Sequence, residues 1–140
     1  MIENINLTRA IHGAGSPLRA VKLPTVRPGE DYQTALRPRV VRAWRKHVRL
    51  RDALRAETTS ANAAKAEAAF DRLIEVTAAT IELPWPRSLE GLGDLVTAVA
   101  MAHDGRCLDD ADPAHRALKR LLSGCFIALK LDPPDGHAGL

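Results

Sequence analysis

Aromatic residues are scarce in this sequence, which has 140 residues of which only 4% are Phe, Trp or Tyr. Strands draw on aromatic and β-branched side chains, whereas a core of Leu, Ile, Val and many Ala favours closely packed helices. The apolar fraction of 46% and the charged fraction of 26% are typical of a globular protein rather than a disordered one. A chain of this length can bury a core as one domain. We therefore expect a single all-α domain.

Cysteines and long apolar runs are also few. The two cysteines, Cys107 and Cys125, cannot build a disulfide framework. No apolar run approaches the roughly 20 residues that cross a bilayer. The first residues lack the basic stretch and apolar run of a secretory signal. These absences predict a cytoplasmic protein with reduced thiols and no membrane partner.

The sequence lacks a pattern that specifies a reaction or a metal ion. Four side chains of metal-binding type occur late in the chain, at His103, Cys107, His115 and Cys125. Their spacing does not match the short ligand pairs of zinc sites. The acids of the loop at 104–112, which are Asp104, Asp109, Asp110 and Asp112, lack the glycine and closing glutamate of a calcium loop. We therefore predict no catalytic residue, no metal site and no cofactor, and a protein that is not an enzyme.

The apolar pattern predicts four helices. Pro38 suits a first helical turn, so the first helix is expected over about 38–57. A turn at 58–62 leads to a second helix over about 62–83, which forms an antiparallel hairpin with the first; one continuous helix is the alternative. Ser88 is expected to cap a third helix over about 89–103. Asp112 and Pro113 mark the start of a fourth, which ends near residue 131.

The overall prediction is a four-helix bundle-like domain with an irregular N-terminal arm. The arm covers residues 1–35, the helical domain 36–132 and a loose C-terminal tail 133–140. The third and fourth helices are expected to pack on the hairpin formed by the first two. Gly91 and Gly93 weaken the first turn of the third helix but would allow another helix to approach it closely. Trp85, between two prolines, is expected to cover one end of the bundle rather than to anchor a partner.

Charge is distributed unevenly along the chain. Residues 1–56 hold twelve lysines and arginines and four acids, a net charge of +8, whereas residues 57–140 hold eight and thirteen, a net charge of −5. In the first helix, one sector is apolar and includes Val40, Trp44 and, near its centre, His47. No carboxylate lies one turn from His47 within its own helix. We expect a partly buried histidine satisfied by a neighbour, and a general base or pH switch is the alternative. The opposite sector is basic: Arg39, Arg42, Arg45, Lys46 and Arg49.

The basic sector is the candidate binding site. We expect a non-catalytic interaction or regulatory module that acts through this helix, with a protein partner or self-association. The alternative is a nucleic-acid-associated protein that contacts the phosphate backbone without sequence readout. The expected third helix has no Lys or Arg, which argues against reading of bases by that element.

Overall fold

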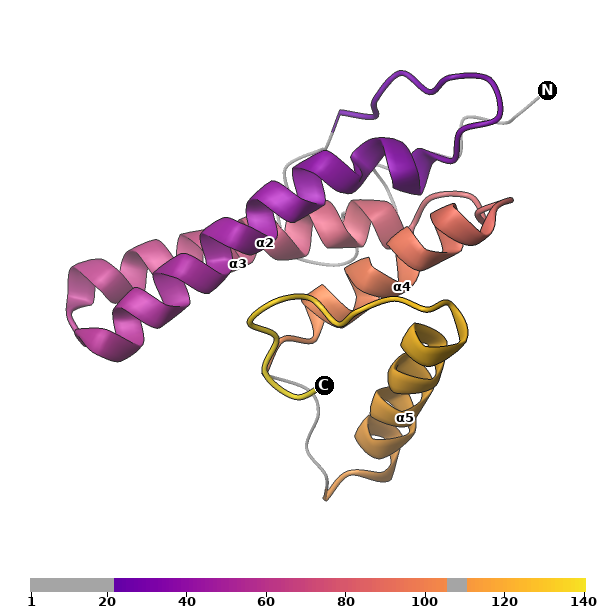
Figure 1. Cartoon of the computed structure of the whole chain (residues 1–140). Helices are drawn as coiled ribbons and strands as arrows, with labels where there is room; N and C mark the ends of the chain where they lie inside the picture. The colour runs from indigo at the N-terminus through magenta and orange to yellow at the C-terminus, as the bar shows by residue number, and fades with distance from the viewer. Residues whose placement is uncertain (1–21, 106–110) are drawn as a thin grey trace.

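The computed structural model describes residues 22–105 and 111–140, and this part of the chain is all-α without a strand (Figure 1). Its helices are α2 (Tyr32–Ala56), α3 (Ser60–Ile81), α4 (Leu89–Ala102) and α5 (Pro113–Ala128). The predicted all-helical, bundle-like class is confirmed. None of the helices described is long and apolar enough to cross a membrane.

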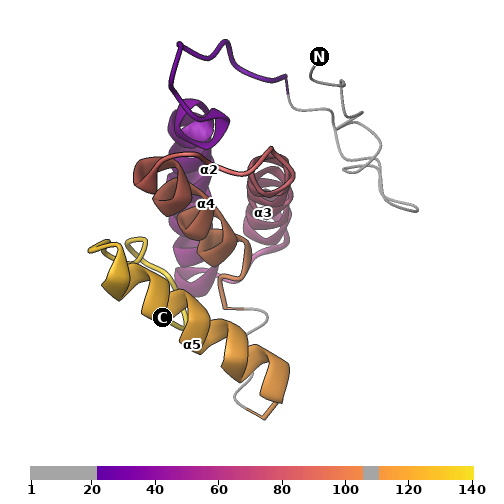
Figure 2. The same ribbon diagram turned by 90° about the vertical axis from the view of Figure 1, so that its right-hand side faces the viewer.

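Helices α2 and α3 form a long antiparallel hairpin and lie side by side in both ribbon views (Figures 1 and 2). The Thr59 hydroxyl accepts a hydrogen bond from the Asn62 backbone N–H at 3.1 Å and so caps α3. The Asn62 side chain donates in turn to the Glu57 carbonyl at 2.9 Å. Because the turn satisfies backbone groups at both helix ends, the chain reverses here, and the predicted hairpin, not the continuous helix, is correct.

The predicted position of Pro38 in a first turn is wrong, because α2 begins at Tyr32 and contains Pro38 in its interior. A proline there removes one helical N–H donor. The additional N-terminal residues bury Gln33 and Leu36, and the Gln33 side chain donates to the Pro84 carbonyl at 2.8 Å. These tertiary contacts override the local signal. The irregular arm was predicted over residues 1–35, but it ends at residue 31, where α2 follows. Of this arm the structure describes residues 22–31, and residues 1–21 lie outside the described residues.

The main core lies where α2, α3 and α4 meet. It is built from buried apolar side chains of all three helices: Val40, Ala43, Trp44, Leu73, Val76 and Met101. The core residues from α2 belong to the apolar sector that the sequence predicts. The prediction that this sector faces the core is confirmed. Burying such side chains is the dominant favourable term in folding, at about 25 cal/mol per Å² of apolar surface.

A second core joins α5 to α4 and places α5 differently from the prediction. Among the helices described, α5 contacts α4 alone and crosses beneath it on the side away from the hairpin (Figure 2). Leu122 and Phe126 of α5 pack on Val96 and Ala100 of α4. Helix α4 is apolar on two sides, because Met101 faces the main core and Val96 the second core. The prediction that the fourth helix packs on the hairpin is therefore wrong.

Glycines at the start of α4 permit close packing, but the prediction that another helix approaches them is wrong, because their neighbours are Asp31, just before α2, and Leu131, beyond the end of α5. A Cβ at Gly91 would overlap the Asp31 carboxylate, and one at Gly93 would lie 3.0 Å from the Leu131 side chain. Asp31 accepts hydrogen bonds from the backbone N–H groups of Arg87 (2.9 Å) and Ser88 (3.0 Å). The same carboxylate accepts from the Ser88 hydroxyl, and these bonds lower the pKa of Asp31. The starts of α2 and α4 are thereby fastened together.

The connection between α3 and α4 also differs from the prediction. Trp85 is 83% exposed, so it does not cover the end of the bundle. Leu83 is buried there instead, and the neighbouring Pro84 carbonyl is held by Gln33. Leu83 therefore fills the end of the bundle, and the hydrogen bond from Gln33 holds Pro84 in place. The Trp85 indole is left in solvent.

Candidate partner-binding surface

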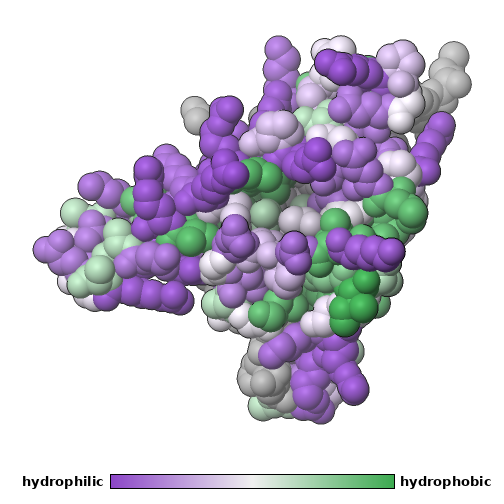
Figure 3. Space-filling view, in the orientation of Figure 1, coloured by the Kyte–Doolittle hydropathy of each residue, from purple (hydrophilic) through white to green (hydrophobic). Residues whose placement is uncertain are grey.

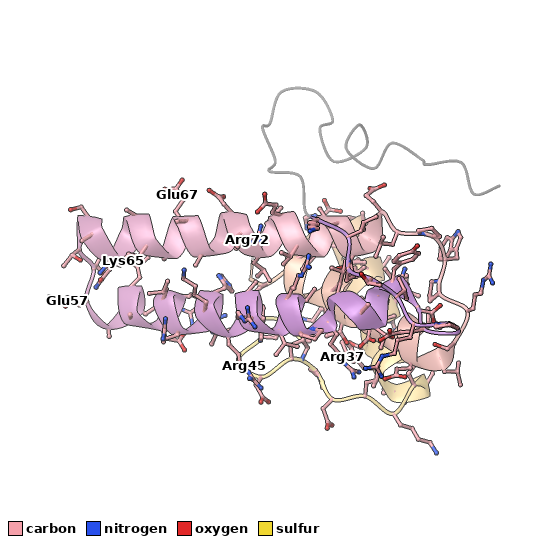
Figure 4. The ribbon with its side chains drawn as sticks, turned by 90° about the horizontal axis from the view of Figure 1, so that it is seen from above. Arg37, Arg45, Glu57, Lys65, Glu67 and Arg72 are labelled. Atoms are coloured by element: carbon pink, nitrogen blue, oxygen red, sulfur yellow. The ribbon has the colours of Figure 1, made fainter. Side chains whose placement is uncertain are left out.

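Four cations form a stripe along the outer face of α2. Arg42, Arg45, Lys46 and Arg49 are all exposed, and their spacing of three and four residues places them on one helical face. Arg45 projects from the edge of α2 that faces away from α3, whereas Glu67 projects from the outer edge of α3 (Figure 4). We call these four residues the basic stripe.

The basic stripe has no acidic counterpart in the part of the chain that the structure describes. Arg37 pairs there with Glu90 and Asp94 of α4, and Arg51 pairs with Asp104. No ion pair or hydrogen bond of a stripe side chain occurs among these residues. The fifth predicted residue, Arg39, is separate from the stripe: it is half-buried and donates to the Lys22 carbonyl. Four of the five predicted site residues therefore lie together, and within the described part of the chain their side-chain donors are free.

Two grooves border the stripe. The first, of about 400 Å³, is lined by Arg37, Pro38, Val41, Arg42 and Arg45. The second, of about 370 Å³, is lined by Val41, Trp44, Arg45, Val48, Arg49, Met101, Pro134 and Asp135. Both contain Val41 and Arg45, so they follow one another along α2. The cations at this surface thus stand beside apolar hollows.

One wall of the second groove comes from residues 133–140, which we call the C-terminal strap. The prediction that these residues form a loose tail is wrong. The Trp44 indole N–H donates to the Asp135 carbonyl at 3.0 Å, and Arg51 donates to the Gly136 carbonyl at 2.8 Å. The His137 ring stacks on Trp44, with its centroid 5.8 Å away. The strap therefore has defined positions along α2.

A buried polar cluster of His47, Arg51 and Asp104 fastens the strap. One oxygen of Asp104 lies 2.7 Å from His47 Nε2 and 2.7 Å from an Arg51 nitrogen. Its other oxygen accepts from the Ala138 backbone N–H at 2.8 Å. The His47 ring is flanked by Trp44 and Phe70, whose ring centroids lie 5.5 and 5.4 Å away. The prediction that a neighbour satisfies His47 is confirmed for Nε2, whereas the buried Nδ1 atom has no hydrogen-bond partner among the described residues.

The ionisation of Asp104 follows from this cluster. Burial disfavours its charged form, but hydrogen bonds from His47, the Ala138 N–H and Arg51 outweigh burial and lower the pKa of Asp104 to about 2. Because Asp104 is ionised near neutral pH, His47 Nε2 carries the proton in the bond between them. A pocket of about 230 Å³ lies beside the cluster. Every Asp104 oxygen already has a protein donor, so the cluster is built to hold the fold together.

Asp94 has the opposite electrostatic environment. Burial raises its pKa, although hydrogen bonds from Thr34 and Arg37 and the charge of Arg37 partly oppose the increase. One carboxylate oxygen of Asp94 is buried without a hydrogen-bond partner. Asp94 lies on α4, where one of its oxygens is 3.4 Å from an Arg37 nitrogen of α2, and its ionisation costs stability at this position.

The remaining candidates from sequence are not brought together. His103 donates to the Val99 carbonyl at 2.8 Å, and His115 lies 3.9 Å from Asp112 at the start of α5. Cys107, Asp109 and Asp110 lie outside the described residues. Within the part of the chain that is described, no three His, Cys, Asp or Glu side chains are placed to hold a metal ion.

Exposed apolar side chains gather on a different part of the molecule. Polar side chains cover most of the hairpin in Figure 3, whereas apolar ones are visible over the α4 and α5 region. Leu89 of α4 and Ile127 of α5 are 75% and 80% exposed, and Trp85 precedes α4.

No protein-family model matches the sequence, and neither a curated protein nor a solved structure is detectably similar to it.

Sequence reasoning found the stripe but missed the grooves and the cluster. Val41 lies at the border of the apolar sector, and the residues that complete the second groove, Met101 and Pro134, come from distant parts of the chain. For the cluster, the available signal was a histidine in the centre of an apolar sector, which requires a buried partner. That partner, Asp104, is 57 residues away, and no local pattern indicates it.

Proposed function

We propose that this protein is a small non-catalytic interaction module that binds an acidic segment of a partner protein along the basic stripe of α2. The observation that carries the proposal is the set of four exposed cations on one face, whose donors have no partner among residues 22–105 and 111–140. Like charges three or four residues apart destabilise a helix by about 0.2–0.5 kcal/mol per pair. Such a stripe is unfavourable for the isolated helix and becomes favourable when an anionic surface covers it.

The grooves favour a protein segment over nucleic acid. Single-stranded nucleic acid binds where exposed aromatic rings accompany the cations, but Trp44 is only 4% exposed and its indole N–H is already bonded to the strap. Aliphatic side chains instead border the stripe, at Val41 and Val48. Apolar hollows with a cationic rim suit an acidic segment that also carries apolar side chains.

Self-association is a second form of interaction that one observation favours. Trp85, Leu89 and Ile127 are each at least three-quarters exposed, and exposed large apolar side chains are typical of association surfaces. Light scattering across protein concentration would detect this association. If the protein is a monomer at all concentrations, the self-association hypothesis is wrong, whereas the proposal of an acidic partner is unaffected.

The test of the function compares charge reversal at the stripe with reversal elsewhere. The stripe variant carries Arg42→Glu, Arg45→Glu and Arg49→Glu. The control carries Lys65→Glu, Arg120→Glu and Lys130→Glu, exposed cations outside α2, so both variants have the same net charge. Binding is measured by fluorescence anisotropy with a labelled Glu/Ala peptide of about 15 residues and with a duplex DNA of about 20 base pairs.

We expect the wild type and the control to bind the peptide and the stripe variant to lose at least about tenfold in affinity, while all three keep the same helical circular dichroism. Stronger binding to DNA than to peptide, with steep salt dependence, would replace the proposal with the phosphate-backbone alternative. Equal loss in both variants would reduce the effect to net charge and contradict the assignment to α2.

A further inference from the structure

The two grooves on α2 lie one helical turn apart. The first spans positions 37–45 and the second 41–49, and both include Val41 and Arg45. One turn of an α-helix advances about 5.4 Å. Two side chains that project from a second helix at positions i and i+4 have the same separation along their own axis. The groove pair therefore matches the periodicity of a helical ligand.

The second groove has apolar walls with no cover among the described residues. Val41 and Val48 are half-buried, and Met101 is buried beneath them. Pro134 of the strap forms the facing wall. The volume of about 370 Å³ is ample for a Leu, Phe or Trp side chain. Filling it would remove apolar surface from water, which favours binding.

The strap holds that wall in place before any ligand arrives. Its backbone is bonded to Trp44 and Arg51 of α2 through the Asp135 and Gly136 carbonyls. Gly136 also approaches Val48 so closely that an added Cβ would lie 2.9 Å from its side chain. A pre-formed wall reduces the ordering cost of binding.

Charge across the second groove is asymmetric. Arg45 and Arg49 form the rim on the α2 side, and Asp135 stands on the strap side. Among the described residues, Asp135 makes no ion pair with either arginine. A ligand with acids beside α2 and neutral or basic residues beside the strap is favoured over the reverse orientation.

We infer that the partner segment is an acidic amphipathic helix with two bulky apolar side chains one turn apart, one in each groove, and with its carboxylates beside Arg45 and Arg49. This inference rests on the proposed function and specifies the partner class for the same surface. It corresponds to the mode in which a helix places its apolar face in a groove.

The first experiment uses three labelled peptides of equal length and net charge. The parent contains Glu and Ala; the second has Leu at positions i and i+4; the third has the same Leu residues at i and i+2, which lie on different helical faces. For the wild type we expect the i, i+4 peptide to bind at least about tenfold more tightly than the other two. Equal affinities for all three peptides would overturn the inference while leaving acid binding at the stripe intact. Absence of binding by any peptide would remove the proposed function itself.

The second experiment places the apolar side chains. Val41→Gln removes the apolar side chain shared by both grooves without a change of charge, and Ile81→Gln on the exposed side of α3 is its matched control. Val41→Gln should remove the advantage of the i, i+4 peptide and leave the affinity of the Glu/Ala parent unchanged. Ile81→Gln should leave both unchanged. An advantage that survives Val41→Gln would contradict the groove assignment.

A spectroscopic measurement does not depend on these variants being folded. Trp85→Phe changes an exposed side chain and leaves Trp44, at the base of the second groove, as the sole tryptophan. Saturation with the i, i+4 peptide should change the Trp44 emission, whereas saturation with the Glu/Ala parent should change it much less. An emission spectrum that responds identically to both peptides would contradict insertion into the groove.

Discussion

Asp104 shows how one carboxylate connects distant parts of the chain. It accepts hydrogen bonds from His47 and Arg51 of α2 and from Ala138 of the strap. Breaking a buried, paired charge typically costs about 3–5 kcal/mol. Asp104→Asn retains the shape but loses the negative charge. We expect it to lower the free energy of unfolding by about 3 kcal/mol at pH 7, measured by urea denaturation with Asp132→Asn, an exposed carboxylate, as control.

The same variant has a defined pH dependence. The folded-state pKa of Asp104 is about 2, below the ordinary aspartate value of 3.8. A carboxylate with a depressed pKa contributes stability that is fully present above its unfolded-state pKa and is lost as the pH falls through its folded-state pKa. The difference between the wild type and Asp104→Asn should therefore be constant from about pH 5 to 7 and shrink toward pH 2. A constant difference down to pH 2 would contradict this account.

Asp94 leads to the opposite prediction. Because burial raises its pKa, the ionised form is less compatible with the fold than the protonated form, and the cost appears as the pH rises above the unfolded-state pKa. Asp94→Asn resembles the protonated acid. It should raise the melting temperature at pH 7 by a few degrees and have little effect near pH 3, as measured by circular dichroism. A lower melting temperature at pH 7 would mean that the Arg37 pair outweighs burial.

Individual side-chain partners were only partly predictable from sequence. The exposure of Arg42, Arg45, Lys46 and Arg49 follows from helical periodicity alone, because each lies opposite the apolar sector. The half-buried state of Arg39 does not follow from helical periodicity, because its side chain donates to the Lys22 backbone carbonyl in the irregular arm. Long-range hydrogen bonds depend on tertiary packing, which a local pattern does not encode.

Within the helices, cap residues gave the most accurate boundaries. Ser88 and Asp112 accept hydrogen bonds from the backbone N–H groups of Gly91 and Ala114, and α4 and α5 begin where these residues predict. The start of α2 was misplaced because Pro38 carries a strong local signal, whereas the burial of Gln33 and Leu36 is a tertiary effect. Capping residues therefore predicted the starts of α4 and α5 correctly. They could not predict the start of α2, because tertiary contacts extend that helix beyond its local signal.

Two helical glycines provide a matched test of close packing. An alanine at Gly91 would overlap the Asp31 carboxylate, which bonds Arg87 and Ser88, whereas an alanine at Gly124 of α5 meets no atom within 4 Å. Gly91→Ala should lower the free energy of unfolding by about 1–3 kcal/mol. Gly124→Ala should raise it by up to about 1 kcal/mol, because alanine favours the helix.

Thermal and urea denaturation of both glycine variants check this prediction. The opposite signs separate the effect of close packing from the general preference of helices for alanine. Stabilisation by Gly91→Ala would mean that Asp31 moves aside at little cost, and that the link between the starts of α2 and α4 is weak.

For the molecule as a whole, the all-helical class and the position of the cationic face could be predicted, but the binding surface could not. The second groove combines Val41 of α2 with Met101 of α4 and Pro134 of the strap. Trp44 and Asp135, which fasten that wall, are 91 residues apart. The strap has few apolar residues, so its composition indicates a loose tail, and only the contacts with the buried cluster give it a fixed position.

The uneven charge along the chain leads to ion pairs between its basic and acidic parts. Of the cations in residues 1–56, Arg37 and Arg51 are neutralised by Asp94 and Asp104 from the acidic part of the chain. The two parts of the chain thus attract one another within one molecule, whereas the basic stripe stays exposed and makes no ion pair among the described residues. That remainder, beside the two grooves, is the basis of the proposed function.

A backbone amide NMR titration with the Glu/Ala peptide that carries Leu at i and i+4 tests the proposal most directly, because it locates the contact on the intact protein. We predict that the largest chemical-shift changes occur at residues 41–49 of α2, at Met101 and at Asp135, with little change in α5 or at Trp85. Changes centred on α5 or Trp85, or none at saturating peptide, would contradict the assignment of the basic stripe and its grooves as the binding surface.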